Sequence, residues 1–403
     1  MYNNSKNVCF LDRGEGLGEA ARTGVSLHCH TLHSKELLDF VPYYAERIPV
    51  VSYFWRREMR RKLERDGRLP DFTTGHWTPP LTGHDVFRME KENLAKLGLE
   101  AMVSITDHDS INGNLEIRRD IDGAVAPISM EWTVPFENAF FHVGVHNLPI
   151  EHAEAITADL LDYTHAKGEP DNGRLHEIFE MLNEFPDVLI VLNHPIWDIE
   201  MIGQQSHERS LARFVAEHAD WIHALEINGF RTWSENQAVI GLANSICLPL
   251  VSGGDRHCCQ SNTMINVTEA ESFAEFVGEV RNDAFSRIVV MPEYKDPLPS
   301  RQLRSIAQIL GNYEHFSEGS RKWPDRVYFD FDDGNGLRTL TDHWNGRVPK
   351  WTNFAFIALS VLAHPAVQPI IALTVGDTDI GRSEKKTGDT GFTISGSPST
   401  SER

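Results

Sequence analysis

The segment GVSLHCHTLHS, residues 24–34, places three histidines within six positions directly after a short apolar run. The run GVSL predicts a buried strand, and residues two apart in an extended chain point to the same side. His28 and His30 are therefore expected to face one way where this strand ends, whereas His33 follows beyond it. Whether the pair forms a site depends on the residues that end the other strands.

Short apolar runs alternate with amphipathic stretches from residue 25 to residue 290. GHDVFRMEKENLAKLGLE predicts a helix that leads into the strand AMVSITDHD, and NGRLHEIFEMLNEFP predicts a helix that leads into DVLIVLNHP. Repeated alternation of this kind predicts an α/β fold with a mainly parallel sheet covered by helices. In such folds the carboxyl ends of the strands gather on one face, where ligands bind.

Six predicted strands carry an imidazole or a carboxylate at or near their ends: His28 and His30; Asp107, His108 and Asp109; Glu131; His142; His194; Asp255 and His257. The strand LEIN, residues 225–228, is the exception because it ends in an asparagine. Any one of these groups has an ordinary explanation as a core residue or a helix cap. Six strands that deliver them together predict a metal site.

The chemistry of these ligands narrows the choice of ion and reaction. Imidazole nitrogens mixed with carboxylate oxygens suit Zn²⁺, Mn²⁺ or Fe²⁺, whereas an all-oxygen site suits Mg²⁺ or Ca²⁺. The candidate ligands exceed the needs of one ion, so two or three divalent ions are expected. Ions clustered in this way activate water and neutralise the oxygens of a phosphoryl group. Hydrolysis of a phosphate ester is therefore the leading reaction.

The ordered series HCH, ITDHDS, ISMEWT, NHP and GGDRH resembles the PHP (polymerase and histidinol phosphatase) superfamily of metal-dependent phosphoesterases. The resemblance covers residues 24–290, with an insertion after the first motif. It implies a distorted (β/α)7 TIM-like barrel with two or three divalent ions at its carboxyl-end face.

The resemblance also implies three ligand groups, of which two share Glu131: His28, His30, Glu131 and Asp255 for one ion; Glu131, His142 and His194 for a second; His108 and His257 for a third. Asp255 or His257 would take or relay the proton of the attacking water. Asp107 and Asp109 flank His108, and either is a candidate to orient its ring, with capping of the next helix as the alternative for Asp109.

The chain departs from the family pattern at Lys35. The family usually continues its first motif as HxHxxxSDG, whose aspartate helps to bind the third ion, but here the sequence is HCHTLHSKE. An ammonium group cannot ligate a metal while it keeps its proton. Either the third site is absent, or His33 or Glu36 supplies the missing ligand. Lys35 itself is a candidate to hold the substrate phosphate, with exposure to solvent as the alternative.

Arg256, between Asp255 and His257, is expected to point away from both and to pack in the barrel wall or form an ion pair. A phosphate-binding role for Arg256 is the alternative. His33 is expected to have a surface or capping role if it is not the substitute ligand.

The domain organisation is predicted as an N-terminal segment (1–23), a PHP-like barrel (24–292) with an insertion (36–83), a C-terminal extension (293–375) and a disordered tail (376–403). The insertion contains the basic stretch YFWRREMRRKLERDGRL. This stretch predicts a solvated helix with ion pairs, and a clamp for a polyanion is the alternative. The uncharged segment 353–375 could span a bilayer, but polar residues and prolines at its centre predict buried pieces instead.

The net charge of −20 over 403 residues argues against a general nucleic-acid-binding protein. A small phosphorylated substrate is expected, with a nucleotide or an oligonucleotide end left open. Five scattered cysteines without a CxxC motif, and an N-terminus without a signal peptide, predict a reduced cytoplasmic protein rather than a membrane protein. The sequence does not constrain the oligomeric state.

Two other functions compete with the phosphoesterase. A degenerate, non-catalytic PHP barrel acting as a binding or regulatory module is favoured by Lys35 but disfavoured by the otherwise intact ligand set. An amidohydrolase-like enzyme acting on C–N bonds is disfavoured because those barrels typically use a metal-bridging lysine and a different order of motifs.

Overall fold

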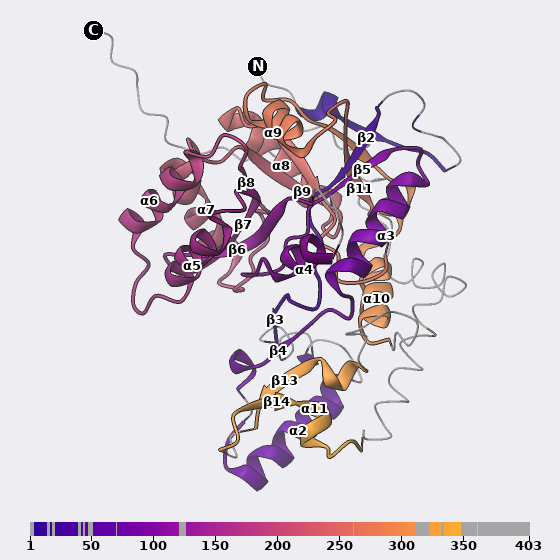
Figure 1. The fold of residues 1–403 in the computed structure, drawn as a ribbon. Coiled ribbons are helices and arrows are strands. Elements are labelled where there is room, and N and C mark those ends of the chain that lie inside the picture. Colours follow the sequence, from indigo (N-terminus) through magenta and orange to yellow (C-terminus); the bar gives the residue numbers. More distant parts are fainter. Residues whose placement is uncertain are drawn as a thin grey trace.

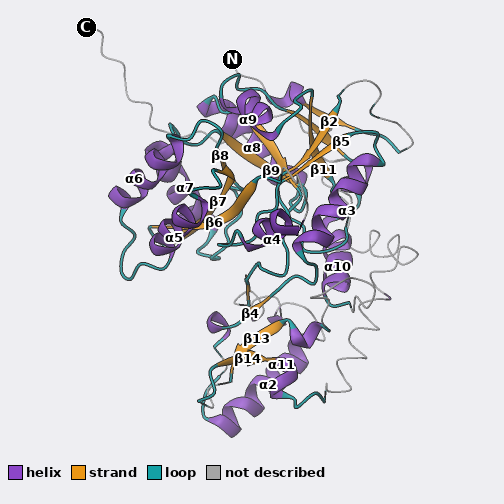
Figure 2. Cartoon of the chain, in the orientation of Figure 1, coloured by secondary structure: helices purple, strands orange, loops and turns teal. Residues whose placement is uncertain are grey.

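The computed structural model describes residues 4–13, 17, 21–38, 42, 45–46, 51–69, 71–120, 126–260, 262–311, 322–331, 334–347 and 361. Two five-stranded sheets form the main body (Figures 1 and 2). The first runs in the order β1 (Val8–Phe10), β12 (Arg287–Val290), β11 (Met264–Thr268), β2 (Thr23–Ser26), β5 (Glu100–Val103). The second runs in the order β10 (Leu250–Gly253), β9 (Ala224–Asn228), β8 (Leu189–Leu192), β7 (Ala139–Leu148), β6 (Ile128–Phe136).

The two sheets meet at two seams where the ladder of backbone hydrogen bonds is interrupted. An isolated parallel bridge pairs His108 with Glu131 at one seam, and another pairs Cys29 with Arg256 at the other. Between β10 and β11 the side-chain amide of Asn266 replaces the ladder: it accepts from the backbone N–H of Ser252 at 2.8 Å and donates to its carbonyl at 2.9 Å. The α/β class is confirmed, whereas a closed (β/α)7 barrel stays a prediction, because the described strands form no continuous ladder.

The expectation of a mainly parallel arrangement is wrong. Within the two sheets, β1–β12, β2–β5, β8–β9 and β9–β10 are parallel pairs, whereas β2–β11, β11–β12, β6–β7 and β7–β8 are antiparallel. The connection between β6 and β7 gives the physical reason. It consists of Glu137 and Asn138 alone, which is too short for the crossover that parallel neighbours need. Glu137 has φ 54°, the left-handed conformation typical of such hairpin turns.

Helices pack against the sheets, and their bounds are α3 (Gly83–Ala95), α4 (Asn112–Asp120), α5 (Ala153–Thr164), α6 (Asn172–Asn183), α7 (Gln204–His218), α8 (Trp233–Ile246), α9 (Phe273–Arg281) and α10 (Leu298–Ile309), with short 3₁₀ turns at Asn4–Asn7, Phe72–Thr74, Pro292–Lys295 and Trp323–Asp325. The helices predicted within 83–100 and 172–186 are confirmed. Helix residues such as Phe179 of α6 and Phe214 of α7 are buried in one core cluster with strand residues such as Trp132 of β6. This burial is the main source of stability and leaves the strand ends free to carry polar groups.

A third sheet, here called the accessory sheet, joins two distant parts of the chain. Its order is β14 (Leu337–Thr339), β13 (Val327–Asp330), β4 (His76–Trp77), β3 (Glu36–Leu37), and every neighbouring pair is antiparallel. The helices α2 (Val51–Asp66) and α11 (Leu340–His343) lie beside β13 and β14, and β3 and β4 lie between these elements and the main body (Figure 1). The helix predicted for the basic stretch is confirmed by α2. The predicted domain boundaries stay predictions, but the insertion and the C-terminal extension share this sheet.

The predictions for 353–375 and for the tail 376–403 fall, apart from Val361, outside the described residues. In the part of the chain that the structure describes, every helix is too short or too polar to cross a membrane.

Candidate metal centre

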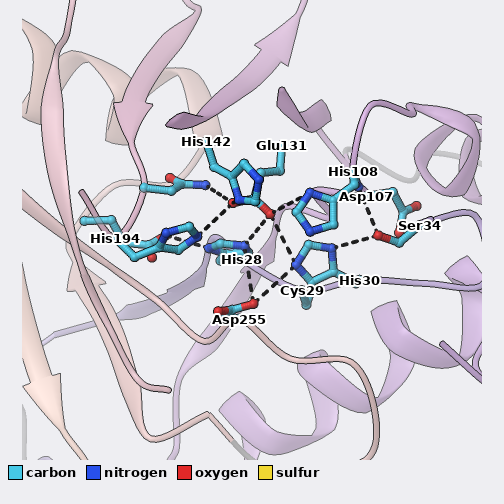
Figure 3. A network of polar contacts seen from close by, with 12 residues as sticks. His28, Cys29, His30, Ser34, Asp107, His108, Glu131, His142, His194 and Asp255 are labelled. Carbon is cyan, nitrogen blue, oxygen red and sulfur yellow. Dashed lines mark hydrogen bonds and ion pairs between the residues drawn. The ribbon is translucent and has the colours of Figure 1, made fainter. Parts of the chain in front are cut away.

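The continuation of β2 places the first two histidines side by side. Beyond the strand the chain stays extended, because the backbone N–H of His30 donates to the carbonyl of Arg256 at 2.8 Å. Neighbouring side chains alternate in an extended chain, so Cys29 points away from the histidines and packs in an apolar cluster. The rings of His28 and His30 approach the same carboxylate, Glu131 (Figure 3).

Glu131, at 0% exposure, is the centre of the site. Its two oxygens contact five imidazoles: Oε2 lies 3.0 Å from His28 Nε2, 3.5 Å from His30 Nε2 and 3.3 Å from His108 Nδ1, and Oε1 lies 3.2 Å from His142 Nδ1 and 3.1 Å from His194 Nε2. Figure 3 shows these rings arranged around the carboxylate. A buried carboxylate whose oxygens serve different sets of histidines has the arrangement of a ligand shared between ions.

Asp255 completes the first ligand group from the end of β10. Its Oδ1 lies 3.6 Å from His30 Nε2 and 3.8 Å from His28 Nε2, whereas Oδ2 faces Arg231 Nη2 at 3.7 Å. The backbone is strained at two of the candidate ligands, since Asp255 has φ 49° and His194 has φ 28°. Such conformations cost about 1–3 kcal/mol each and persist only where the surrounding fold holds them.

Glu36, from β3, forms a third group with histidines of the main body. Its carboxylate lies 3.1 Å from His257 Nε2, 3.4 Å from His108 Nε2 and 3.9 Å from His30 Nδ1. Ser34 links this group together, because its hydroxyl donates to Glu36 at 2.7 Å and accepts from the backbone N–H of His108 at 3.1 Å. Of the alternatives for the missing aspartate, the structure therefore places Glu36 among the predicted third-ion ligands.

The spacing of these groups fits divalent ions. An ion bonded at about 2.0–2.2 Å separates neighbouring donor atoms by roughly 3.0–3.5 Å, and the shortest carboxylate–imidazole distances around Glu131 Oε2, Glu131 Oε1 and Glu36 are 3.0, 3.1 and 3.1 Å. In addition, His30 Nε2 and His142 Nδ1 are buried without a hydrogen-bond partner. Buried polar atoms are normally paired, so a bound ion would satisfy both. The described residues therefore form overlapping groups that could hold divalent ions, while the identity and number of ions stay predictions.

Three carboxylates and His30 have the protonation states that metal ligands need. Burial alone would raise the pKa of Glu131 and Asp255, but the surrounding imidazoles hold both pKa values well below the usual range. The pKa of Glu36 is lowered in the same way by His257 and His108, against the effect of burial. Burial lowers the pKa of His30 to about 3. Ionised carboxylates and neutral imidazoles are the forms that bind metal.

Two histidines stand out because carboxylates crowd them. Burial lowers the pKa of His28, but Glu131 and Glu226 outweigh it and hold this pKa well above its usual value. Glu36 and Glu131 act in the same way on His108 and raise its pKa to about 10. The nearby carboxylates therefore stabilise a positive charge at both rings. A bound divalent ion would supply this charge in place of protons.

Glu226 on β9 was not predicted, because the strand LEIN ends in an asparagine and was set aside. Its Oε2 pairs with His28 Nδ1 at 2.7 Å, and its Oε1 accepts from Asn228 Nδ2 at 2.6 Å. The pair fixes the ring of His28 so that Nε2 faces Glu131, which is how outer carboxylates orient metal-binding histidines. A carboxylate within an apolar strand is the signal that would have identified Glu226, because burying a charge requires a partner.

Asn193 was also not predicted as part of the site, and the two aspartates that flank His108 form hydrogen bonds with other residues. The amide of Asn193 donates to Glu131 Oε1 at 3.0 Å, which no sequence pattern indicates. Asp107 accepts from the backbone N–H and the hydroxyl of Thr31 at 2.5 and 2.7 Å, so it holds the histidine loop rather than the ring of His108. The side chain of Asp109 accepts from the backbone N–H of Thr133 at 2.8 Å, and its charge is among those that raise the pKa of His108.

Neither basic residue predicted for the substrate phosphate has a side-chain contact with the cluster among the described contacts. Lys35 is exposed, as its alternative interpretation expected. Arg256 is buried in an ion pair with Glu90, which was its default interpretation, and nothing in the geometry supports the phosphate-binding alternative. His33 pairs with Glu116 at 3.2 Å and contacts no residue of the cluster in the described contacts.

Arg231, in the loop after β9, is the basic residue that lies beside the cluster, and it was not predicted. Its guanidinium is 3.5 Å from the centre of the Trp197 ring, on which it stacks, and 3.7 Å from Asp255 Oδ2. The ring of Trp197 in turn contacts His194, with ring centres 5.1 Å apart. Stacking holds the planar guanidinium in place and leaves its N–H groups directed outward from the ring edge.

No family model matches the chain, and comparison with curated proteins gives no match. Several solved structures match the chain, among them PsfC from Pseudomonas syringae (17% identity, TM-score 0.39, covering 68% of this chain and 95% of that chain), a candidate metal-dependent phosphoesterase from Bifidobacterium adolescentis (16%, 0.34, 50% and 91%), and an amidohydrolase from Chromobacterium violaceum with bound sulfate and no metal (15%, 0.30, 45% and 84%). At these TM-scores the likenesses decide neither the fold nor the reaction. The geometry of the cluster carries the argument that follows.

Proposed function

We propose that this protein is a metal-dependent phosphoesterase of the PHP type that hydrolyses a phosphate ester by direct attack of water. The observation that carries the proposal is the position of Glu131, whose two oxygens face separate sets of histidines within a fully buried cluster. A site that only stabilised the fold would gain nothing from burying several carboxylates and imidazoles together, because desolvating such groups is costly.

Divalent ions bound to these residues would lower the pKa of a coordinated water and neutralise phosphoryl oxygens. The residues of the cluster have three further roles: ion binding, orientation of a ring and proton transfer. Glu131 with its histidines would hold the ions, and Glu226 orients His28. Asp255 Oδ2 points away from His28 and His30 toward Arg231, so we assign it to accept the proton of the attacking water.

His257 was the other candidate for the proton acceptor. Its Nε2 faces Glu36 at 3.1 Å and its Nδ1 lies 3.9 Å from Asp255. A nitrogen that holds an ion cannot accept a proton at the same time. We therefore assign His257 to ion binding and leave proton transfer to Asp255.

Arg231 supplies the contact to the substrate. A guanidinium donates two parallel hydrogen bonds to a phosphate more readily than an ammonium does, and Trp197 holds the Arg231 side chain at the edge of the cluster. This position replaces the predicted phosphate contacts of Lys35 and Arg256. We propose a small phosphorylated molecule as the substrate, with a nucleotide or an oligonucleotide end as the broader alternative, because the net charge of −20 opposes long polyanions.

Hydrolysis of C–N bonds is the second candidate reaction. The residue shared between ligand groups here is the carboxylate of Glu131 rather than the lysine expected of an amidohydrolase-like barrel. The degenerate-barrel alternative is opposed by the cluster itself, since every predicted ligand contacts at least one other. The phosphoesterase is therefore the better supported function.

The test compares two reactions on one preparation. The chain is stripped with chelator and reloaded with Mn²⁺, Zn²⁺ or Fe²⁺ in turn, and is then assayed with p-nitrophenyl phosphate, bis-p-nitrophenyl phosphate and an anilide substrate. We expect phosphoester hydrolysis that Glu131→Gln lowers by at least about 100-fold, whereas His33→Ala retains it, because His33 pairs outside the cluster. Cleavage of the anilide alone, or equal phosphoester rates in Glu131→Gln and the wild type, would contradict the proposal.

A further inference from the structure

One end of the accessory sheet enters the metal centre. Glu36 on β3 pairs in register with Trp77 on β4, and the ring of Trp77 lies 5.6 Å from that of His257. The strand β4 pairs in turn with β13, where Trp77 is opposite Val327. The carboxylate that faces His257 is therefore connected through two strand pairs to the C-terminal extension.

The group around Glu36 combines ligands from two parts of the chain. His108 and His257 follow strands of the main body, and the Nε2 atom of each faces the carboxylate of Glu36, at 3.4 and 3.1 Å. Glu36 itself belongs to the accessory sheet. An ion bound among these three residues would consequently be held by both parts at once.

The position of β13 affects the position of Glu36, because the side chains between β13 and β3 are closely packed. Phe329 on β13 is buried, with 8% exposure, and its ring contacts that of Phe72 at 5.3 Å between centres. Gly75 has no space for a side chain, because an added Cβ would lie 2.7 Å from Phe329 and 2.8 Å from Leu38. Leu38 follows β3 directly and donates its backbone N–H to the carbonyl of Gly75 at 3.3 Å.

We propose that a divalent ion bound by Glu36, His108 and His257 joins the accessory sheet to the main body, so that ion binding and the order of this sheet stabilise each other. The inference rests on the proposed function for the presence of the ions. It gives the C-terminal extension a role: β13 holds β4 and β3 in the position from which Glu36 completes the site. Loss of that packing would weaken the binding of one ion, although every residue that binds it is unchanged.

Coupling of this kind is reciprocal. If an ion favours the docked accessory sheet by some factor, docking of the sheet favours the ion by the same factor. Where only a fraction of molecules has Glu36 in place, the apparent dissociation constant of this ion rises by the inverse of that fraction. The two effects are measured independently, one by ion titration and the other by backbone hydrogen exchange.

The experiment uses the full chain, stripped with chelator and titrated with Mn²⁺ alone. Calorimetry and elemental analysis count the ions, and hydrogen exchange with mass spectrometry follows residues 71–82 and 322–331. In the wild type we expect Mn²⁺ to slow exchange several-fold in both segments. Glu36→Gln should bind one ion fewer and lose this protection, while the ions at Glu131 remain.

Phe329→Ala tests the coupling from the other side. It should raise the dissociation constant of the ion at Glu36 roughly tenfold, because docking of the accessory sheet is lost. The matched substitution Phe285→Ala, at an exposed phenylalanine of the main body, should leave the dissociation constant of every ion unchanged. If Glu36→Gln binds as many ions as the wild type, or if Mn²⁺ leaves both segments unprotected, the inference is wrong although the proposed function stands. If the wild type binds no ion, both are wrong.

Discussion

Replacement of Glu226 by glutamine should weaken metal binding although Glu226 is not itself expected to bind metal. In the native protein Glu226 accepts two hydrogen bonds, from His28 Nδ1 at 2.7 Å and from Asn228 Nδ2 at 2.6 Å. The amide of Asn228 cannot turn round, because its oxygen accepts from the backbone N–H of Phe230 at 2.7 Å. A glutamine has only one accepting oxygen for these two donors.

Each orientation of the new amide has a cost. If its oxygen faces Asn228, its NH₂ group faces His28. Nδ1 of His28 must then accept a hydrogen bond, so the ring proton moves to Nε2, which is the atom that would bind the metal. If its oxygen faces His28, two donors meet at Asn228. Leaving one buried polar group unsatisfied costs about 1–3 kcal/mol, which corresponds to an affinity loss on the order of 10- to 100-fold.

The assay is titration of the chelator-treated protein with Mn²⁺ or Zn²⁺, followed by calorimetry. The matched control is Glu116→Gln, which removes the charge from another glutamate–histidine pair, that with His33 at 3.2 Å outside the cluster. We expect weaker binding in Glu226→Gln only. Equal dissociation constants for Glu226→Gln, Glu116→Gln and the wild type would refute the argument that Glu226 sets the tautomer of His28.

Three further predictions concern the substrate, the packing around the centre and the dependence of stability on pH. Arg231→Ala should raise KM for the phosphate ester by about tenfold or more while the metal content measured by elemental analysis stays unchanged, because Arg231 is expected to contact substrate rather than metal. Gly253→Ala should lower both thermal stability and metal content, since its Cβ would overlap the carboxylate of Glu226; an alanine variant with wild-type Tm and metal content would disprove this. Burial and the nearby Arg281 lower the pKa of His223 to about 3, compared with 6.5 in the unfolded chain, so the unfolded state alone binds this proton between these pH values. Stability from this group is thus complete above pH 6.5 and falls by about 1.4 kcal/mol per pH unit below it; urea unfolding from pH 7 to 5 should show a shallower loss in His223→Gln, and parallel curves for variant and wild type would rule the assignment out.

The candidate ligands could be predicted because regular strands bring their ends together. His28 and His30 follow from the alternation of side chains, and His194 and Asp255 follow from apolar runs that end in polar residues. These residues lie in one cluster in the structure. What each of them binds stays a prediction, since geometry shows the fit and not the ion.

The antiparallel pairs were predictable in principle but were not predicted. Apolar runs identify strands without giving their direction, and direction has to be read from the connections. The two residues between β6 and β7 are too few for a parallel crossover. The direction of β11 could not be predicted in this way, because one of its two neighbours, β2, comes from near the N-terminus.

The accessory sheet and its contribution to the site could not be predicted from local patterns. The pairing of residues 76–77 with residues 327–328 joins segments separated by most of the chain. Glu36 could only be proposed as an alternative, because its position relative to His257 depends on that pairing. Arg231 was missed for a similar reason: its stacking on Trp197 arises between two loops.

The most direct test of the account is the metal content of the purified chain, measured by elemental mass spectrometry after reloading and removal of free ions. The wild type and His33→Ala should each hold two or three equivalents of Mn, Zn or Fe, whereas His194→Ala, which loses a contact to Glu131 at 3.1 Å, should hold fewer. A wild-type chain without bound metal after reloading, or one whose content is the same in His194→Ala, would contradict the central claim that Glu131 bridges a cluster of divalent ions.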